Sequence, residues 1–216
     1  MPTPERIEKV ERVLAQRQAD LRIVLEGVTI AHNASAVIRT CDAAGVLYLD
    51  LVAPNPELLH FNEAISTRAD KWLEIAVHPT PASCIEPLKR AGFEIVATHL
   101  RPDAVSYTDI DFAKPIALVF GSEAGGISDD CLAFADKVVR IPMLGMVQSL
   151  NLSVSVAVML YEALRQRTVK GYAGASKLPA EEYARLRKDW LRLAEEPQIA
   201  DAANHPSTTR GKKNRE

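Results

Sequence analysis

The sequence predicts an α/β fold in which a mostly parallel sheet carries helices on both faces and is flanked by further helices at its N- and C-terminal ends. Apolar segments rich in β-branched residues alternate along the chain with segments of helical periodicity. The apolar segments are continuous runs, which is typical of strands buried on both faces of a parallel sheet. Such sheets bind ligands beyond the carboxyl ends of their strands, so functional residues are expected there.

The composition indicates an ordinary globular protein with a large core. Of 216 residues, 47% are hydrophobic and 25% are charged, which excludes disorder of the whole chain. No apolar run approaches the roughly 18 residues that a membrane span needs, and the polar N-terminus shows no signal peptide, so we expect no membrane partner and a cytoplasmic location. Cys41, Cys84 and Cys131 are far apart and predict neither a disulfide framework nor a zinc site.

Caps, stops and helical spacing place the helices. Pro4, with Thr3 as its cap, begins a helix whose apolar residues repeat at helical spacing up to about residue 20. A second helix begins with Asn33 or Ser35 as its cap and stops at Gly45. Further helices are expected over 80–91, just after Ser128, over 149–166 and over 179–194.

Apolar runs rich in Val, Ile and Leu place the strands. The run at 46–53 is closed by Pro54 and Pro56, which cannot donate to a ladder of hydrogen bonds. The runs at 93–100 and 116–121 are rich in β-branched residues, as strands are. Strands are therefore expected over 22–28, 46–53, 73–78, 93–100, 116–121 and 138–142.

Charge is distributed unevenly along the chain. Residues 1–22 carry five basic and four acidic side chains, residues 23–160 carry nine and sixteen, and residues 161–192 carry eight and four. Basic segments that flank an acidic body allow a nucleic-acid partner, although solvated surface helices often look the same. We divide the chain into a basic N-terminal helix (1–20), a central domain (21–167) and a C-terminal helix with a basic tail (168–216).

The first segment that carries chemistry is AHNASAVIRT, at 31–40. It places Asn33 near the end of a strand and Arg39 about one turn into the following helix. An amide and a permanent cation near a helix N-terminus suit a phosphate or a developing oxyanion. A capping Asn and a surface Arg are the structural alternative.

The second segment is LVFGSEAGGIS, at 118–128. A strand ends in a loop with Gly121, Gly125 and Gly126, and glycine lets a backbone approach a ligand closely. The loop lacks both the Gly-Lys-Ser/Thr ending of a P-loop and the GxGxxG fingerprint of a dinucleotide site. Glu123 stands where a carboxylate at a strand end would meet a ligand, and a plain turn is the alternative.

The third segment is IPMLGMVQSLNLSVSVAVMLYEALRQR, at 141–167. Pro142 and Gly145 bend the chain before a helix whose start carries Ser149 and Asn151. The helix is small and apolar nearly all round, which is typical of a helix buried on more than one side. It therefore suits the core or a dimer interface.

Together, HNASAVIRT, LVFGSEAGGIS and IPMLGMVQSLNLSVSVAV resemble the three motifs of the SpoU/TrmH family of RNA ribose 2′-O-methyltransferases, in the same order and at normal distances. The resemblance covers about residues 5–170. The segments VIRTCDAAGV, RADKWL, VATHL, MLGMVQSLNLSV and LYEALRQR further resemble the branch that methylates a guanosine of tRNA. A short helix stands where the related ribosomal RNA enzymes carry a long N-terminal RNA-binding domain.

The resemblance implies a SPOUT-type fold whose C-terminal part is tied in a deep trefoil knot, working as a homodimer with its site near the interface. It implies S-adenosylmethionine held mainly through backbone contacts, and the ribose of guanosine 18 in the D-loop of tRNA as substrate. The cofactor positions match Thr98, His99, Leu100, Gly121, Ile141, Met143, Ser149 and Leu150. The functional polar positions match Asn33, Arg39, Glu123, Ser149 and Asn151. The tRNA-contacting regions match Arg6, Arg12, Arg17, Arg165 and Arg167.

The chemistry of the reaction assigns a role to Arg39. A ribose hydroxyl is a very weak acid, so charge develops on its oxygen during methyl transfer, and a guanidinium can stabilise that charge. Arg39 does not serve as the base, because a guanidinium hardly ever loses its proton in a protein. Asn33 would orient Arg39 or the ribose, and Glu123 could accept a proton. No metal is needed.

Three alternatives stay open at the level of sequence. The chain could methylate a different RNA, either ribosomal RNA or the anticodon loop of tRNA, although the basic helix at 179–194 favours the D-loop. It could be a catalytically silent RNA-binding relative, although Arg39, Glu123 and Asn151 are intact. A nucleotide-binding oxidoreductase is the third reading, and it lacks its fingerprint.

Overall fold

The computed structural model describes residues 2–28, 31–55, 69–122, 125–172 and 177–195. Its centre is a seven-stranded sheet in the order β3-β2-β1-β6-β4-β7-β5, and every described strand pair is parallel. The strands are β1 Gln18–Glu26, β2 Val46–Val52, β3 Glu74–His78, β4 Glu94–Thr98, β5 Val105–Ser106, β6 Ile116–Phe120 and β7 Lys137–Arg140. The expected parallel α/β sheet is therefore confirmed.

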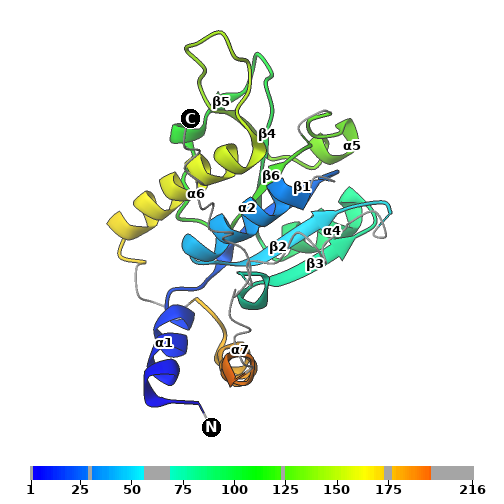
Figure 1. Ribbon diagram of the computed structural model, residues 1–216. Helices are drawn as coiled ribbons and strands as arrows, with labels where there is room; N and C mark the ends of the chain where they lie inside the picture. The colour runs from blue at the N-terminus through cyan, green and yellow to red at the C-terminus, as the bar shows by residue number, and fades with distance from the viewer. Residues whose placement is uncertain (1, 29–30, 56–68, 123–124, 173–176, 196–216) are drawn as a thin grey trace, which may run out of the picture.

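Helices cover both faces of this sheet (Figure 1). The helices are α1 Pro4–Leu14, α2 Ala31–Ala43, α4 Pro81–Arg90, α5 Asp129–Leu132, α6 Leu152–Val169 and α7 Ala180–Glu195, with 3-10 turns η2 Ala69–Trp72 and η3 Tyr107–Asp109. Within β1, Ile23 and Leu25 pack in one core cluster with α2 and α6, whereas Val24 packs in another with α4. Successive side chains of a strand point to opposite faces, so the two clusters lie on opposite sides of the sheet.

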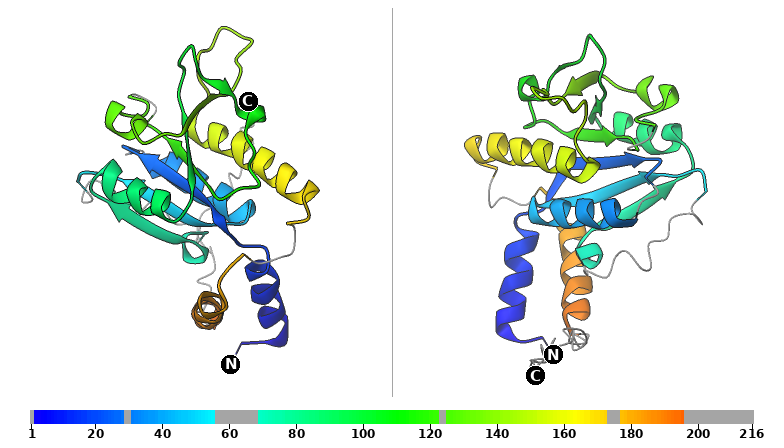
Figure 2. Two further views of the ribbon diagram at one scale, coloured as in Figure 1. Left: turned by 180° about the vertical axis from the view of Figure 1, so that it is seen from behind. Right: turned by 45° about the horizontal axis from the view of Figure 1, so that its top comes forward.

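A third apolar cluster joins the two ends of the described chain. Val10 and Leu14 of α1 pack with Leu186 and Trp190 of α7, and the two helices lie side by side beyond the sheet (Figure 2). The ring of Trp190 meets that of Trp72 edge to face, with centroids 5.3 Å apart. Helices far apart in sequence thus form one unit next to β2.

Several local signals act as the sequence predicts. Thr3 caps α1 ahead of Pro4, Ser128 caps α5, and Gly45 follows α2 with a φ of 79°, a left-handed conformation that glycine adopts readily. Other boundaries differ. The first helix ends at Leu14, because Gln18 already begins β1 and donates its backbone N–H to the Gly45 carbonyl oxygen at 3.0 Å. Pairing within the sheet overrides the helical spacing there.

Two expected caps are corrected by the structure. Asn33 and Ser35 both lie inside α2, which begins at Ala31, so neither caps it and Arg39 lies deeper in the helix than expected. The helix expected from Ser149 begins at Leu152 instead, with Asn151 as its cap. None of the described helices combines the length and the apolar character needed to cross a membrane. The tail at 196–216 lies outside the described residues.

Candidate active site

A cavity of about 510 Å³ lies at the carboxyl ends of β4 and β6. Three segments line it: residues 98–100 after β4, residues 120–122 with Gly126 after β6, and residues 148–152 with Ser155 at the start of α6. The volume lies within the range of small-molecule sites. The position is the one expected for a ligand in a parallel sheet, beyond the carboxyl ends of the strands.

The glycine loop after β6 folds back tightly on itself. Ser122 and Gly126 exchange backbone hydrogen bonds of 3.1 and 2.9 Å, and the Ser122 Oγ accepts from the Gly125 N–H at 3.0 Å. A Cβ on Gly121 would lie 2.0 Å from the backbone carbon and oxygen of Gly126, so no larger residue fits at that position. Glu123, one of the expected polar residues, lies outside the described residues.

A carboxylate anchors the far side of this loop. Glu26, at the end of β1, accepts from the Ser128 N–H at 2.8 Å and from the Ser128 hydroxyl at 2.5 Å. The Ser128 Oγ in turn accepts from the Cys131 N–H and caps α5. The loop that borders the cavity is therefore tied to two strands and a helix.

The polar start of α6 forms the opposite wall. The Asn151 Oδ1 accepts from the Ser153 backbone N–H at 2.9 Å and from the Ser153 hydroxyl at 2.6 Å. The Asn151 Nδ2 donates to the Asn33 Oδ1 at 3.2 Å, which joins α6 to α2. Asn33 is only 5% exposed, whereas Asn151 and Ser149 are exposed and line the cavity. The structure thus brings together Asn33, Ser149 and Asn151 from two distant sequence segments.

Arg39 is exposed on α2 and does not line the cavity. Its guanidinium makes no ion pair or hydrogen bond with any residue that the structure describes. Since no described residue occupies its N–H donors, the Arg39 guanidinium can offer them to a ligand.

Six of the expected cofactor positions line the cavity, namely Thr98, His99, Leu100, Gly121, Ser149 and Leu150. Ile141 and Met143 are not among its lining residues. Sequence reasoning did not single out Phe120, Ser122, Gln148, Leu152 or Ser155 as ligand contacts, although all five stand within the segments that it quoted. The available signal was the end of a predicted strand for Phe120 and Ser122, and the start of a predicted helix for the other three.

Arg17 and Arg167, expected among the tRNA contacts, are buried, and this expectation is corrected. Arg17 is 0% exposed, pairs with the Asp42 carboxylate, and donates to the carbonyl oxygens of Asp42 and Val46 at 3.1 Å each. Its guanidinium also lies over the Trp190 ring. These contacts hold α1 and α7 to the central domain, so no donor of Arg17 faces solvent.

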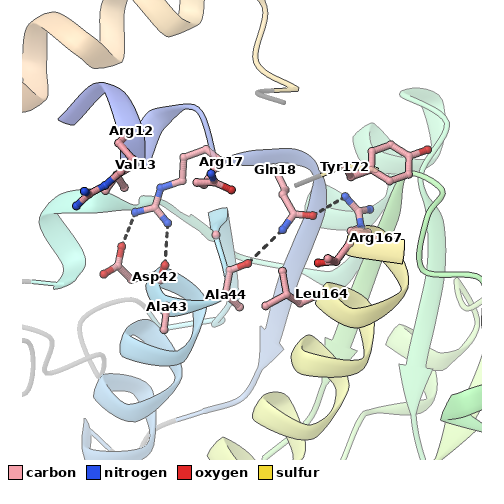
Figure 3. Close-up of a pocket in the computed structure, with 13 residues that line it drawn as sticks. Arg12, Val13, Arg17, Gln18, Asp42, Ala43, Ala44, Leu164, Arg167 and Tyr172 are labelled. Carbon is pink, nitrogen blue, oxygen red and sulfur yellow. Dashed lines mark hydrogen bonds and ion pairs between the residues drawn. The ribbon is translucent and has the colours of Figure 1, made fainter. Parts of the chain in front are cut away.

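Arg167 is equally enclosed, at 1% exposed. It pairs with Asp20 at 2.5 Å and donates to Gln18 and to the carbonyl oxygens of Phe112, Asp20 and Lys114 at 2.8–3.1 Å. Both arginines border a second cavity of about 390 Å³ beside the start of β1 (Figure 3). Their charges are satisfied within the protein.

The remaining expected RNA contacts differ in their availability. Arg12 is exposed and Arg6 is half-buried, and neither side chain is paired with a described residue. Arg165 is exposed, but it donates to both carboxylate oxygens of Glu162 at 2.7 and 2.8 Å. The Arg165 guanidinium holds the pKa of Glu162 below its usual range.

A buried ionic network lies on the α4 side of the sheet. Asp50 is 2% exposed and accepts from the Arg22 Nη1 at 3.0 Å, while the His78 Nε2 lies 2.9 Å from its other oxygen. The Cys84 thiol lies nearby, and these three side chains are the one group in the described part of the chain that could surround a metal ion. Burial raises the pKa of Cys84 well above its ordinary value, which disfavours the thiolate that would bind a metal.

Comparisons with known proteins agree with this geometry. A model of the SpoU rRNA Methylase family matches residues 20–161, which include the sheet and all three lining segments. The tRNA (guanosine(18)-2′-O)-methyltransferase of Thermus thermophilus is 46% identical over 190 residues, covering 88% of this chain and 97% of that protein.

Two solved structures extend the comparison. The A. aeolicus TrmH/SpoU tRNA-modifying enzyme superposes with a TM-score of 0.81 at 40% identity, covering 88% of this chain and 96% of that one. The SpoU methyltransferase AviRb of Streptomyces viridochromogenes, in complex with AdoMet, superposes with a TM-score of 0.61 at 29% identity, covering 68% of this chain and 57% of that one.

Proposed function

This chain belongs to the SpoU methylase family, and on that premise we propose that it methylates the ribose 2′-oxygen of guanosine 18 in the D-loop of tRNA, using S-adenosylmethionine. The observation that carries the proposal is the identity of 46% over nearly the whole length of a relative with that activity. Such a substrate also favours a cytoplasmic location.

The cavity fits the cofactor. Its lining combines apolar side chains, among them Leu100, Leu150 and Leu152, with the polar side chains of residues such as Thr98 and Ser149, which suits a ligand that has both apolar and polar parts. Glycines at 121 and 126 let the loop after β6 pass close to a ligand. When bound, S-adenosylmethionine supplies a methyl group activated by its sulfonium. We assign the contacts to Thr98, His99, Leu100, Gly121, Ile141, Met143, Ser149 and Leu150.

The chain's own residues supply alignment and electrostatics. The methyl group that the cofactor supplies would be taken up by the ribose oxygen, and the hydroxyl proton would be accepted by a carboxylate such as that of Glu123 or by solvent. Arg39, which pairs with none of the described residues, stabilises the charge that develops on that oxygen or positions a neighbouring phosphate. Asn33 and Ser149 orient the ribose and hold the ligand, Asn151 contributes through its hydrogen bond to Asn33, and alignment alone can supply several kcal/mol. No step requires a metal.

The chain works as a homodimer in this proposal. Leu144 and Met146, in the loop before α6, are fully exposed in the protomer, and Val147 and Leu100 beside the cavity are mostly exposed. Large apolar side chains exposed close together in sequence support an interaction site there. We therefore propose that the partner copy packs next to the cavity.

The knot is also part of the proposal. The sheet order supports it, because β6 lies between β1 and β4 while β7 lies between β4 and β5. The chain therefore crosses repeatedly between neighbouring strands before α6 packs beside α2. The lining segments of the cavity belong to this crossing region.

The flanking helices carry the RNA contacts. We keep the division into an N-terminal part (1–20), which holds α1 and the first residues of β1, a methyltransferase domain (21–167) and a C-terminal part (168–216). Arg6, Lys9 and Arg12 on α1 make no ion pair with a described residue, and the same holds for Lys188 and Arg192 on α7. Unpaired cations on two adjacent helices suit a phosphate backbone.

Nuclease mapping of the product tests the proposal. Unfractionated tRNA is incubated with the protein and radiolabelled S-adenosylmethionine, and the modified ribose is located. The expected product carries the methyl group at guanosine 18, and a matched tRNA with 2′-deoxyguanosine at that position should take up none. Methylation of an anticodon-loop ribose, or of ribosomal RNA alone, would assign a different substrate.

A further inference from the structure

The cap of α6 fixes which way the Asn151 amide faces. A capping atom must accept the N–H groups at the start of a helix, and only the oxygen of an amide can do so. The Asn151 Oδ1 fills this place, accepting from the Ser153 N–H and hydroxyl at 2.9 and 2.6 Å. The amide nitrogen must therefore point the other way.

That nitrogen meets Asn33. The Asn151 Nδ2 donates to the Asn33 Oδ1 at 3.2 Å, and a nitrogen that carries hydrogens can only be matched by an acceptor. The Asn33 amide is thus oriented in turn, with its oxygen toward Asn151. Its own Nδ2 has no partner among the described residues and is not a fully enclosed atom.

We propose that Asn151 is a positioning residue that sets the polarity of the Asn33 amide, so that Asn33 presents a hydrogen-bond donor, not an acceptor, to the ribose oxygen. This rests on the proposed methyl transfer. A donor stabilises the negative charge that develops on that oxygen, whereas an acceptor repels it. The helix cap thereby determines what Asn33 does in the reaction.

Two substitutions reverse this polarity without removing the side chains. In Asn151→Asp a carboxylate oxygen keeps the cap, which an acid at a helix N-terminus favours, but its second oxygen now faces Asn33. The Asn33 amide must rotate, and its oxygen then faces the ribose. Asn33→Asp places an oxygen there directly and leaves Asn151 unchanged, so it tests the proposal even if Asn151→Asp fails to fold.

The expected result is a loss of kcat in both variants of about 100- to 1000-fold, as is usual when one donor to a developing oxyanion is lost. The added charge alone could also lower kcat, so Asn33→Ala and Asn33→Ala/Asn151→Asp form the control pair. In the Asn33→Ala background, Asn151→Asp should change kcat by less than about threefold, because the substitution acts through the Asn33 side chain and that side chain is absent.

Two kinetic outcomes would overturn the proposal: near-normal kcat in either Asp variant, or an equal loss from Asn151→Asp with and without the Asn33 side chain. A readout that needs no turnover separates this from failure of the proposed function. In ¹⁵N-labelled protein, the side-chain amide of Asn33, identified by its absence from Asn33→Ala, should shift downfield in Asn151→Asp as it turns to donate to a carboxylate. An unchanged resonance contradicts the rotation, whatever the substrate.

Discussion

Two arginines on neighbouring helices of this molecule differ in exposure and in pairing. Arg39 lies exposed on α2 without a partner in the described residues, whereas Arg167, on the adjacent α6, is enclosed and donates to five groups. Arg17 shares the second pattern. Enclosed and paired cations contribute to stability, while an exposed cation that pairs with no described residue stays available to a ligand. We call the region around Arg17 and Arg167 the junction, and it is distinct from the exposed surface around Arg39.

The largest effect is expected at the junction. Arg167→Ala leaves Asp20 with only Lys177 as a partner among the described residues, at 3.4 Å, and removes the Arg167 donor from the carbonyl oxygens of Phe112 and Lys114, and breaking such a buried group typically costs about 3–5 kcal/mol of unfolding free energy. Denaturant titration measures this. Arg165→Ala is the matched control on the same helix, because Arg165 is exposed and should leave the midpoint nearly unchanged. Equal unfolding midpoints for the two variants would contradict the distinction between enclosed and exposed arginines.

The exposed loop before α6 should show the reverse behaviour. Replacing Leu144 and Met146 together by Asp should give a monomer, because two charges would be buried in the proposed interface. The protomer itself should stay folded, since both side chains are fully exposed in it. Sedimentation measures the outcome, with the exposed Val169→Asp at the other end of α6 as control. An unchanged dimer would place the interface elsewhere.

A smaller effect is expected on α1. Changing Lys9 and Arg12 to Ala should weaken tRNA binding and reduce the slope of log affinity against log salt by roughly 0.7–0.9 per lost phosphate contact. Arg90→Ala on α4, where Arg90 pairs with Glu86, is the control that removes a cation from another surface. Affinity for S-adenosylmethionine should not change. Identical salt slopes for both variants would show that α1 is merely solvated.

The sequence predicts the parallel sheet and the three lining segments well, because both depend on local patterns. Continuous apolar runs mark buried strands, and Gly121 follows directly on the end of such a run, whereas the start of α6 beside Asn151 was predicted three residues too early. Helix boundaries fail where tertiary contacts decide them. Gln18 pairs within the sheet although its neighbours keep a helical spacing, and β5 has only two residues.

The sequence alone could not predict which side chains form ion pairs or hydrogen bonds with one another. Arg17 and Arg167 carry the same charge as Arg12, and only the fold shows that Asp42, Asp20 and distant carbonyl oxygens surround the first two. The Asn33–Asn151 contact spans 118 positions and is equally invisible to local patterns. Long-range pairing therefore decides which members of a motif are free to meet a ligand.

The most direct test of the contrast is Arg39→Ala, measured for turnover, cofactor binding and stability together. An exposed guanidinium that pairs with no described residue and acts only in the transition state predicts a fall in kcat equivalent to about 2.7–4 kcal/mol of activation free energy. The dissociation constant of S-adenosylmethionine and the unfolding midpoint should stay close to those of the unmodified protein. A near-normal kcat, or a loss that follows a fall in stability as expected for Arg167→Ala, would contradict the account.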